Sequence, residues 1–393
     1  MDARDAESLP PLERVPEDVR VAIMSGFDSV QGLGSLIKSS PVFYRTFLSF
    51  KSYILVRVVC NILGPVAMDA RVLAQTSRFS DEDHDKQTKA GVQKYYESLQ
   101  KRGASWGSGL RTETVMQLAK WTRIVEYFVD LYILFHLDYF RHNLDQRHAP
   151  STLVERQRIA QALIRYQVLC YMHGERLWKF RSCEFYTQVS GLFESWEMEQ
   201  VSQMNYFIGA LHNSIETFEE IWRNPLHGRY YPKDRALNLT DLGAFHDKLH
   251  EISEGVGGGL PKRLSIRYMT HNTEITTYFG TIFLTTGRHA HPGISCPCVN
   301  TSTSPSNLEP ESPTSPPWAW HDAIHTEKGC GWGQDLIRVP VEQRGNPDSV
   351  NEVFRKWRWL GFMFWDKQRS QKLLEAEMCK PFPSGWLRDH IKH

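Results

Sequence analysis

The stretch TETVMQLAKWTRIVEYFVDLYILFHLDYF, residues 112–140, determines the fold class of this chain. Its apolar side chains recur every three or four residues, which is the period of one face of an α-helix. The stripe consists of Val115, Leu118, Thr122, Val125, Val129, Tyr132, His136 and Tyr139. Its most apolar part, 124–140, carries three acidic residues. It is also shorter than the roughly 20 uncharged residues of a membrane span, so we expect a buried helix over about 112–141.

Two more long helices are expected beside this one, and together they predict a core of antiparallel helices. The second begins at TLVE (152–155), which fits a capping box: the Thr152 hydroxyl accepts a first-turn amide proton while Glu155 reaches back. Its stripe is Ile159, Leu163, Tyr166 and Cys170. The third helix, about 196–222, has the stripe Val201, Met204, Ile208, Leu211, Ile215, Phe218 and Trp222.

Shorter elements surround this centre. Three short helical patterns lie between 15 and 50, and an apolar helix over 47–63 ends at Gly64-Pro65. Further helices are expected over 66–77 and over 239–255, the latter capped by Thr240 and closed by Gly255. The stretch 264–286 is rich in Thr, Ile, Tyr and Phe, which is typical of strands. We therefore expect a mainly α fold in which only 264–286 is a candidate for a minor β segment.

The predicted organisation has five parts. A disordered leader (1–11) precedes a helical module (12–50) and a helical body (51–255). An irregular, loop-rich insertion follows at 256–345, and its Ser/Pro/Thr-rich part, 300–317, is expected to be disordered. Trp-rich helices at 346–393 are expected to pack on the body.

Composition restricts the function classes. The chain has 393 residues, with 46 Lys and Arg against 45 Asp and Glu, so its net charge of +1 gives no electrostatic case for nucleic acid or an anionic membrane. The opening segment is acidic, and it lacks both the basic region and the apolar region of a secretory signal. Seven scattered cysteines are then expected to be reduced thiols, in the cytosol or the nucleus.

Candidate chemistry is sparse. His246 and His250 share a helix face at a spacing that suits zinc, but Asp247 stands where a metalloprotease has Glu, and no third ligand follows. The pair also flanks an apolar stripe, so edging a packing face is the favoured interpretation. The Cys-Pro-Cys at 296–298 lacks the spacing of a zinc site, and the Arg- and Trp-rich stretch 354–369 is favoured as core rather than as a stacking surface for nucleic acid. We expect no metal, no cofactor and no catalysis. A metal-dependent hydrolase that uses His246 and His250 is the third of three functional hypotheses, behind two that involve no catalysis.

The opening module carries the most specific motif, Val15-Pro16-Glu17-Asp18-Val19, followed by Ile23, Phe27-Asp28-Ser29, Leu33, Leu36-Ile37, Ser39-Ser40 and Phe43-Tyr44. This pattern, over about 15–50, resembles an F-box. It departs from the family where Val15 replaces Leu, Asp18 replaces Glu, Phe27 replaces Leu and Ser40 replaces Cys. Gly26, Gly32 and Gly34 are expected to loosen helices, each at a cost of up to about 1 kcal/mol in a helix interior.

The rest of the chain resembles a large group of uncharacterised proteins of filamentous fungi. The likeness rests on Ser40-Pro41-Val42-Phe43, on Asp69-Ala70 and on the closing GFMFWDKQR at 361–369. It implies no activity, and 255–329 fits it least.

The F-box resemblance implies docking to a Skp-family adaptor of an SCF ubiquitin ligase, while the helical body holds a substrate protein. The residues implied in docking are Val15, Pro16, Asp18, Val19, Ile23, Phe27, Leu33, Leu36 and Ile37. The alternative is a non-catalytic interaction or scaffold protein that no longer docks an adaptor. Complete burial of Ile23 and Phe27 against the body would favour that alternative.

Overall fold

The computed structural model describes residues 11–76, 110–143, 150–173 and 241–255, and parts of 193–211, 312–317 and 361–372. These described residues are 85% helical and contain no strand, which confirms the mainly α class. The candidate β segment at 264–286, residues 296–298, and most of the predicted leader, insertion and C-terminal helices lie outside them.

The chain divides into two compact units, residues 1–128 with 167–177 and residues 129–166 with 178–393. Each unit is discontinuous in sequence because two long helices, α7 (Thr112–Asn143) and α8 (Leu153–His173), contribute a part to both. Both helices begin within one residue of the positions predicted from the apolar pattern of α7 and from the capping box of α8.

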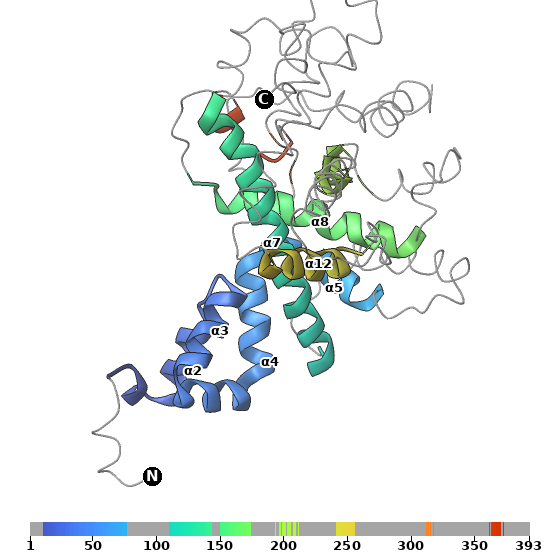
Figure 1. Ribbon diagram of the computed structural model, residues 1–393. Helices are drawn as coiled ribbons and strands as arrows, with labels where there is room; N and C mark the ends of the chain where they lie inside the picture. Colours follow the sequence, from blue (N-terminus) through green and yellow to red (C-terminus); the bar gives the residue numbers. More distant parts are fainter. Residues whose placement is uncertain are drawn as a thin grey trace, which may run out of the picture. The chain divides into compact units, whose positions relative to one another are not determined.

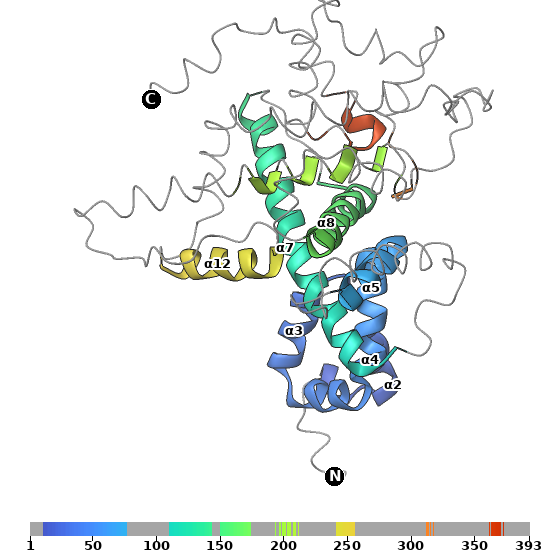
Figure 2. The same cartoon turned by 90° about the vertical axis from the view of Figure 1, so that its right-hand side faces the viewer.

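Unit 1 opens with a helical head. A short 3-10 turn, η1 (Pro11–Arg14), leads into α2 (Glu17–Ser25), α3 (Val30–Ser39) and α4 (Pro41–Leu63). Both α2 and α3 pack against α4, and the three helices lie side by side in both views (Figures 1 and 2). Helices α2 and α3 confirm two of the three short helical patterns expected between 15 and 50, whereas the third is continuous with the helix expected over 47–63 and forms α4 with it.

Helix α4 is kinked at Phe50, whose φ of −118° and ψ of 21° leave the helical region. Directly before the kink, the Ser49 hydroxyl donates to the Arg45 carbonyl at 3.3 Å, a hydrogen bond of a kind that commonly bends helices. Beyond the kink the helix continues to Leu63, and Gly64 ends it with a φ of 51°, which glycine adopts without strain. The predicted module boundary at residue 50 therefore falls inside one helix.

The remaining short helices of unit 1 are the 3-10 turn η2 (Gly64–Val66) and α5 (Ala67–Thr76). By length and composition alone, the stretch Pro41–Ala74 is apolar enough to cross a membrane. Half of its most apolar window is buried inside the protein, and Ile54, Val58, Val59 and Leu63 are fully buried. A core helix has the same properties, and the kink and the Gly64-Pro65 break also interrupt this stretch.

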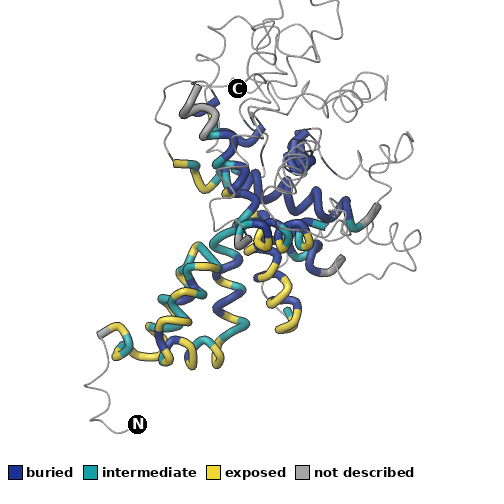
Figure 3. The backbone as a smooth tube through the Cα atoms, viewed as in Figure 1, coloured by how far each residue is buried: buried dark blue, intermediate teal, exposed yellow. Residues whose placement is uncertain are grey.

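Unit 2 is built on the C-terminal part of α7 and the N-terminal part of α8. Along α7, which both units share, the predicted stripe is buried from Val115 to His136. Helix α8, however, is buried on every face from Gln157 to Cys170 (Figure 3), including the polar residues between its apolar ones. The four residues predicted to form the buried stripe of α8 are all buried, but the polar faces of the helix are buried too. The periodicity of apolar residues identifies only the apolar face.

Helix α12 (Leu242–Gly255) also belongs to unit 2. Its stripe Leu242, Phe245, Leu249 and Ile252 is buried, and the helix ends at Gly255 as expected. The predicted cap was one residue off. Asp241, not Thr240, caps the helix: its Oδ1 accepts the amide protons of Gly243 at 2.8 Å and Ala244 at 3.2 Å.

Candidate functional site

Two serines fix the geometry of the head. The Ser29 hydroxyl accepts the Gly32 amide proton at 3.3 Å and caps α3, while the Ser40 hydroxyl does the same for Phe43 at 3.3 Å and caps α4. Pro41 occupies the first position of α4, where its missing N–H costs nothing, and Phe43 is fully buried. The Ser40–Phe43 element of the fungal resemblance therefore has a structural role as a helix start.

Two polar side chains hold the loops of the head. Arg20 donates from Nη1 to the Val15 carbonyl at 2.6 Å and from Nε to the Thr46 hydroxyl at 3.0 Å, which joins the entry of α2 to α4. Asn61 donates from Nδ2 to the carbonyls of Ser25 at 2.8 Å and Phe27 at 3.0 Å, at the turn between α2 and α3. A partner would therefore meet a preorganised surface.

The residues implied in docking fall into three exposure classes. Pro16, Asp18 and Val19 are exposed, and Val19 keeps 39% of its surface. Val15, Ile23, Phe27, Leu36 and Ile37 are half-buried. Leu33 is only 1% exposed and fills the core of the head, so a docking surface must be formed by the other eight residues.

Phe27 is half-buried because its ring lies over α3. A Cβ placed on Gly32 would come within 3.1 Å of the Phe27 ring, so glycine allows this close approach. Gly26 lies at the C-terminal cap of α2 rather than inside a helix. Of the three glycines expected to loosen the head, only Gly34 has open space around it.

Sequence reasoning missed four large exposed side chains on α4: Tyr44, Leu48, Phe50 and Tyr53. Because α4 is apolar along most of its length, its sequence pattern gives little sign of which apolar residues face solvent. Exposed aromatic side chains of this size are enriched where proteins meet partners.

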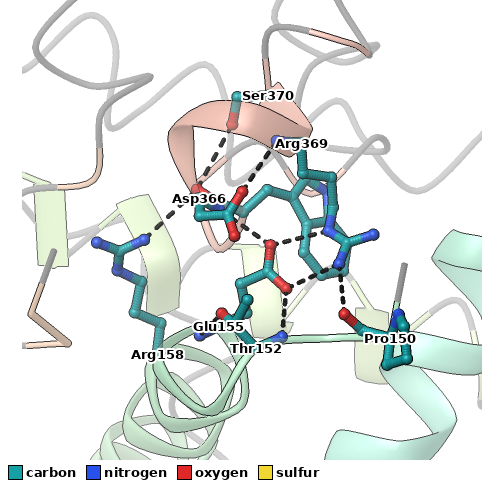
Figure 4. Close-up of polar contacts among 8 residues, drawn as sticks. Pro150, Thr152, Glu155, Arg158, Asp366, Arg369 and Ser370 are labelled. Carbon is teal, nitrogen blue, oxygen red and sulfur yellow. Dashed lines mark hydrogen bonds and ion pairs between the residues drawn. The ribbon is translucent and has the colours of Figure 1, made fainter. Parts of the chain in front are cut away.

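A second candidate is the buried polar cluster of unit 2, centred on Glu155 (Figure 4). The predicted capping box is confirmed: the Glu155 amide donates to the Thr152 hydroxyl at 3.2 Å, and the Thr152 amide donates to Glu155 Oε2 at 2.8 Å. The same carboxylate also accepts from Arg369, from Nε at 2.8 Å and Nη2 at 3.1 Å, and from the Asp366 amide at 3.0 Å. Glu155 is fully buried, and this set of donors offsets the cost of desolvating its charge.

The GFMFWDKQR element at 361–369 supplies the partners of Glu155. Gly361 has a φ of 72°, and a Cβ there would lie 2.5 Å from the Tyr132 hydroxyl oxygen. Trp365 is fully buried, Asp366 Oδ1 accepts the Arg369 amide proton at 2.9 Å, and Arg369 also donates to the Pro150 carbonyl at 3.0 Å. Each of these residues therefore has a packing or pairing role in unit 2.

Arginines and glutamines continue this polar interior along α8. Arg158 donates to the carbonyls of Trp365 at 3.4 Å and Ser312 at 3.3 Å, and Arg165 pairs with Glu197 at 2.7 Å. Buried charges are costly unless they are paired, so these contacts hold distant segments of unit 2 in place. They are more consistent with an architectural cluster than with a reactive site.

Burial shifts the pKa values of three groups. Burial lowers the pKa of His136 to about 4, against a smaller opposing effect of its hydrogen bond to the Tyr132 carbonyl. Nδ1 of His136 lies 2.8 Å from that oxygen, and the His136 ring stacks on the Tyr132 ring at 3.8 Å. Burial also raises the pKa of Tyr127 to about 12 and raises that of Cys60. His136 is therefore neutral at pH 7.

The predicted histidine pair is present on α12. The ring centroids of His246 and His250 lie 4.6 Å apart, and His246 Nδ1 lies 3.1 Å from the Asp247 carboxylate. His246 is buried and His250 is exposed. Among the described residues, no group of three or more His, Cys, Asp and Glu side chains is placed to hold a metal ion.

Comparisons with known proteins found no match among protein-family models, curated proteins or solved structures.

Proposed function

We propose that this chain is a substrate-binding adaptor of an SCF-type ubiquitin ligase, whose head docks a Skp-family adaptor. The observation that carries the proposal is the accessibility of the α2 edge. Val19 is exposed, and Ile23 and Phe27 are half-buried rather than enclosed. An apolar edge held rigidly by Arg20 and Asn61 suits helix-in-groove recognition.

The body of the protein supports a binding role more than a chemical one. The buried ionisable groups described above are paired with each other or with backbone groups. Under the proposal, adaptor docking is the task of the head and substrate binding is the task of the remaining helices.

A scaffold without adaptor docking is the second candidate. Two observations favour it: Leu33 lies in the core of the head, and the Phe27 ring packs on Gly32. In that case the apolar residues of the motif mainly hold the head together.

Co-purification of the full chain with a Skp-family adaptor tests both candidates. We expect a complex that Val19→Asp weakens by about tenfold or more, because a charge would be buried in an apolar contact. Leu153→Asp is the matched control, since Leu153 is similarly exposed on α8 and should leave binding unchanged.

Two results would overturn adaptor docking. The first is the absence of a complex with the unmodified chain, which would favour the scaffold. The second is an intact complex with the double variant Val19→Asp, Ile23→Asp, provided that circular dichroism shows a folded protein.

A further inference from the structure

A hydrogen bond joins α4, the last helix of the head, to α7, and two exposed apolar side chains lie close to it in the two helices. Ser52 Oγ on α4 donates to Thr112 Oγ1 on α7 at 3.2 Å. Tyr53, next to Ser52, is 57% exposed, and Met116, one helical turn beyond Thr112, is 40% exposed. All four residues belong to unit 1.

Basic side chains follow both apolar residues along the same helix stripes. Arg57 lies one turn beyond Tyr53, and Lys120 and Arg123 continue the stripe of Thr112 and Met116 at spacings of four and three. All three are exposed, and none forms an ion pair with another described residue. The Tyr53–Met116 face is defined here as Tyr53, Arg57, Met116, Lys120 and Arg123.

The face has an unbalanced local charge on a chain that is nearly neutral overall. It carries three positive charges and no acidic side chain, whereas the whole chain has a net charge of +1. Glu113 and Glu126 on α7 are the acidic residues nearest to it in sequence, each three positions from a residue of the face. A local excess of one sign selects partners of the opposite sign and raises their rate of encounter.

We propose that the Tyr53–Met116 face binds an acidic segment of a partner protein, in which an apolar side chain is flanked by Asp or Glu. The apolar side chain would pack on Tyr53 and Met116, since tyrosine and methionine are both enriched at interfaces and methionine adapts to varied shapes. The flanking carboxylates would pair with Arg57, Lys120 and Arg123. None of its residues belongs to the proposed docking set between Val15 and Ile37, so this site does not depend on adaptor docking.

The size of the face favours a protein segment over a membrane or a nucleic acid. The opposite sides of both helices are buried, with Ile54 and Val58 on α4 and Val115 and Leu118 on α7. The face has three basic side chains, Arg57, Lys120 and Arg123. Polybasic contacts with anionic membranes use clusters of about four to eight Lys and Arg, and binding of nucleic acid depends on neutralising several phosphates.

Fluorescence anisotropy with the full chain tests the proposal without any adaptor present. The probe is a labelled synthetic peptide in which each Leu is flanked by Glu residues. We expect the peptide to bind, to bind more weakly as salt is added, and to lose about tenfold or more in affinity in the double variant Tyr53→Glu, Met116→Glu. Leu153→Glu is the matched control, because Leu153 is also 57% exposed but lies in unit 2.

A second double variant, Arg57→Glu with Lys120→Glu, reverses the charge of the face and keeps its apolar side chains. We expect this variant to bind a peptide with Lys in place of Glu more tightly than it binds the acidic peptide. The proposal is overturned if the acidic peptide does not bind, or if Leu153→Glu weakens binding as much as the double variant. Tighter binding of anionic vesicles or of a single-stranded oligonucleotide through the same residues would also overturn it.

Discussion

His136 combines a titratable ring with a site that excludes water. Its ring stacks on Tyr132 and lies within 6.5 Å of the Phe207 and Trp365 ring centroids. A cation at this position would lose its hydration, and none of these rings supplies the full negative charge that would compensate. The neutral form is therefore the one that fits the core.

This environment predicts a loss of stability in mild acid. The pKa of His136 is about 4 in the folded protein, whereas the pKa of an unperturbed histidine side chain is 6.5. Below pH 6.5 the unfolded state therefore binds the proton more readily than the folded state. The His136 contribution is absent at pH 7, grows unfavourable as the pH falls from 6.5 toward 4, and levels off below 4, reaching at most about 3 kcal/mol.

Urea unfolding of the unmodified chain and of His136→Gln between pH 7 and pH 5 measures this effect. The difference between the two proteins isolates the His136 contribution from that of other titrating groups. Stability should fall more steeply with acid in the unmodified chain, and parallel pH profiles would contradict the prediction.

At the scale of elements, α3 contains a pair of glycines that differ only in their surroundings. Nothing lies within 4 Å of a Cβ built on Gly34, whereas one on Gly32 meets the Phe27 ring at 3.1 Å. We expect Gly34→Ala to stabilise unit 1 by about 0.5–1 kcal/mol, because alanine restricts the unfolded chain and favours the helix. Gly32→Ala should lack this gain or reverse it.

Thermal melting of the two single variants checks the comparison. Each serves as the control for the other, since both place the same side chain on the same helix. An equal gain from both substitutions would show that the Phe27 ring does not need the space at Gly32.

The sequence was most informative about where the helices begin and end. The ends of helices depend on local chemistry. The start of α8 at the Thr152–Glu155 capping box and the end of α4 at Gly64-Pro65 were therefore predictable from neighbouring residues alone. The cap of α12 was misplaced by one residue because Thr240 and Asp241 are both good cap residues. The complete burial of α8 was not predictable, because it depends on chain segments far away in sequence.

At the scale of the whole molecule, the Glu155–Arg369 pair joins residues separated by 214 positions. The GFMFWDKQR motif that contains Arg369 was singled out in the sequence, but the partner of this arginine was not. Glu155 already had a sufficient local explanation as a capping residue. Nothing in a single sequence indicates that one carboxylate serves both a helix cap and a distant arginine.

We expect Arg369→Leu to lower the free energy of unfolding by about 3–5 kcal/mol, because it leaves a buried carboxylate without its cation. Gln368→Leu, at an exposed neighbouring position, should have little effect. The double variant Glu155→Leu, Arg369→Leu should cost less than the sum of the single variants, since it removes both charges together. Denaturant unfolding monitored by tryptophan fluorescence measures these three variants together with the single variant Glu155→Leu.

The wide separation of Glu155 and Arg369 also has a consequence during synthesis on the ribosome. At about 5–20 residues per second, the 214 positions between them take roughly ten to forty seconds to translate. Throughout that interval the nascent α8 carries a carboxylate whose cationic partner does not yet exist. Unit 2 therefore gains this buried ion pair only after the segment that carries Arg369 has been made.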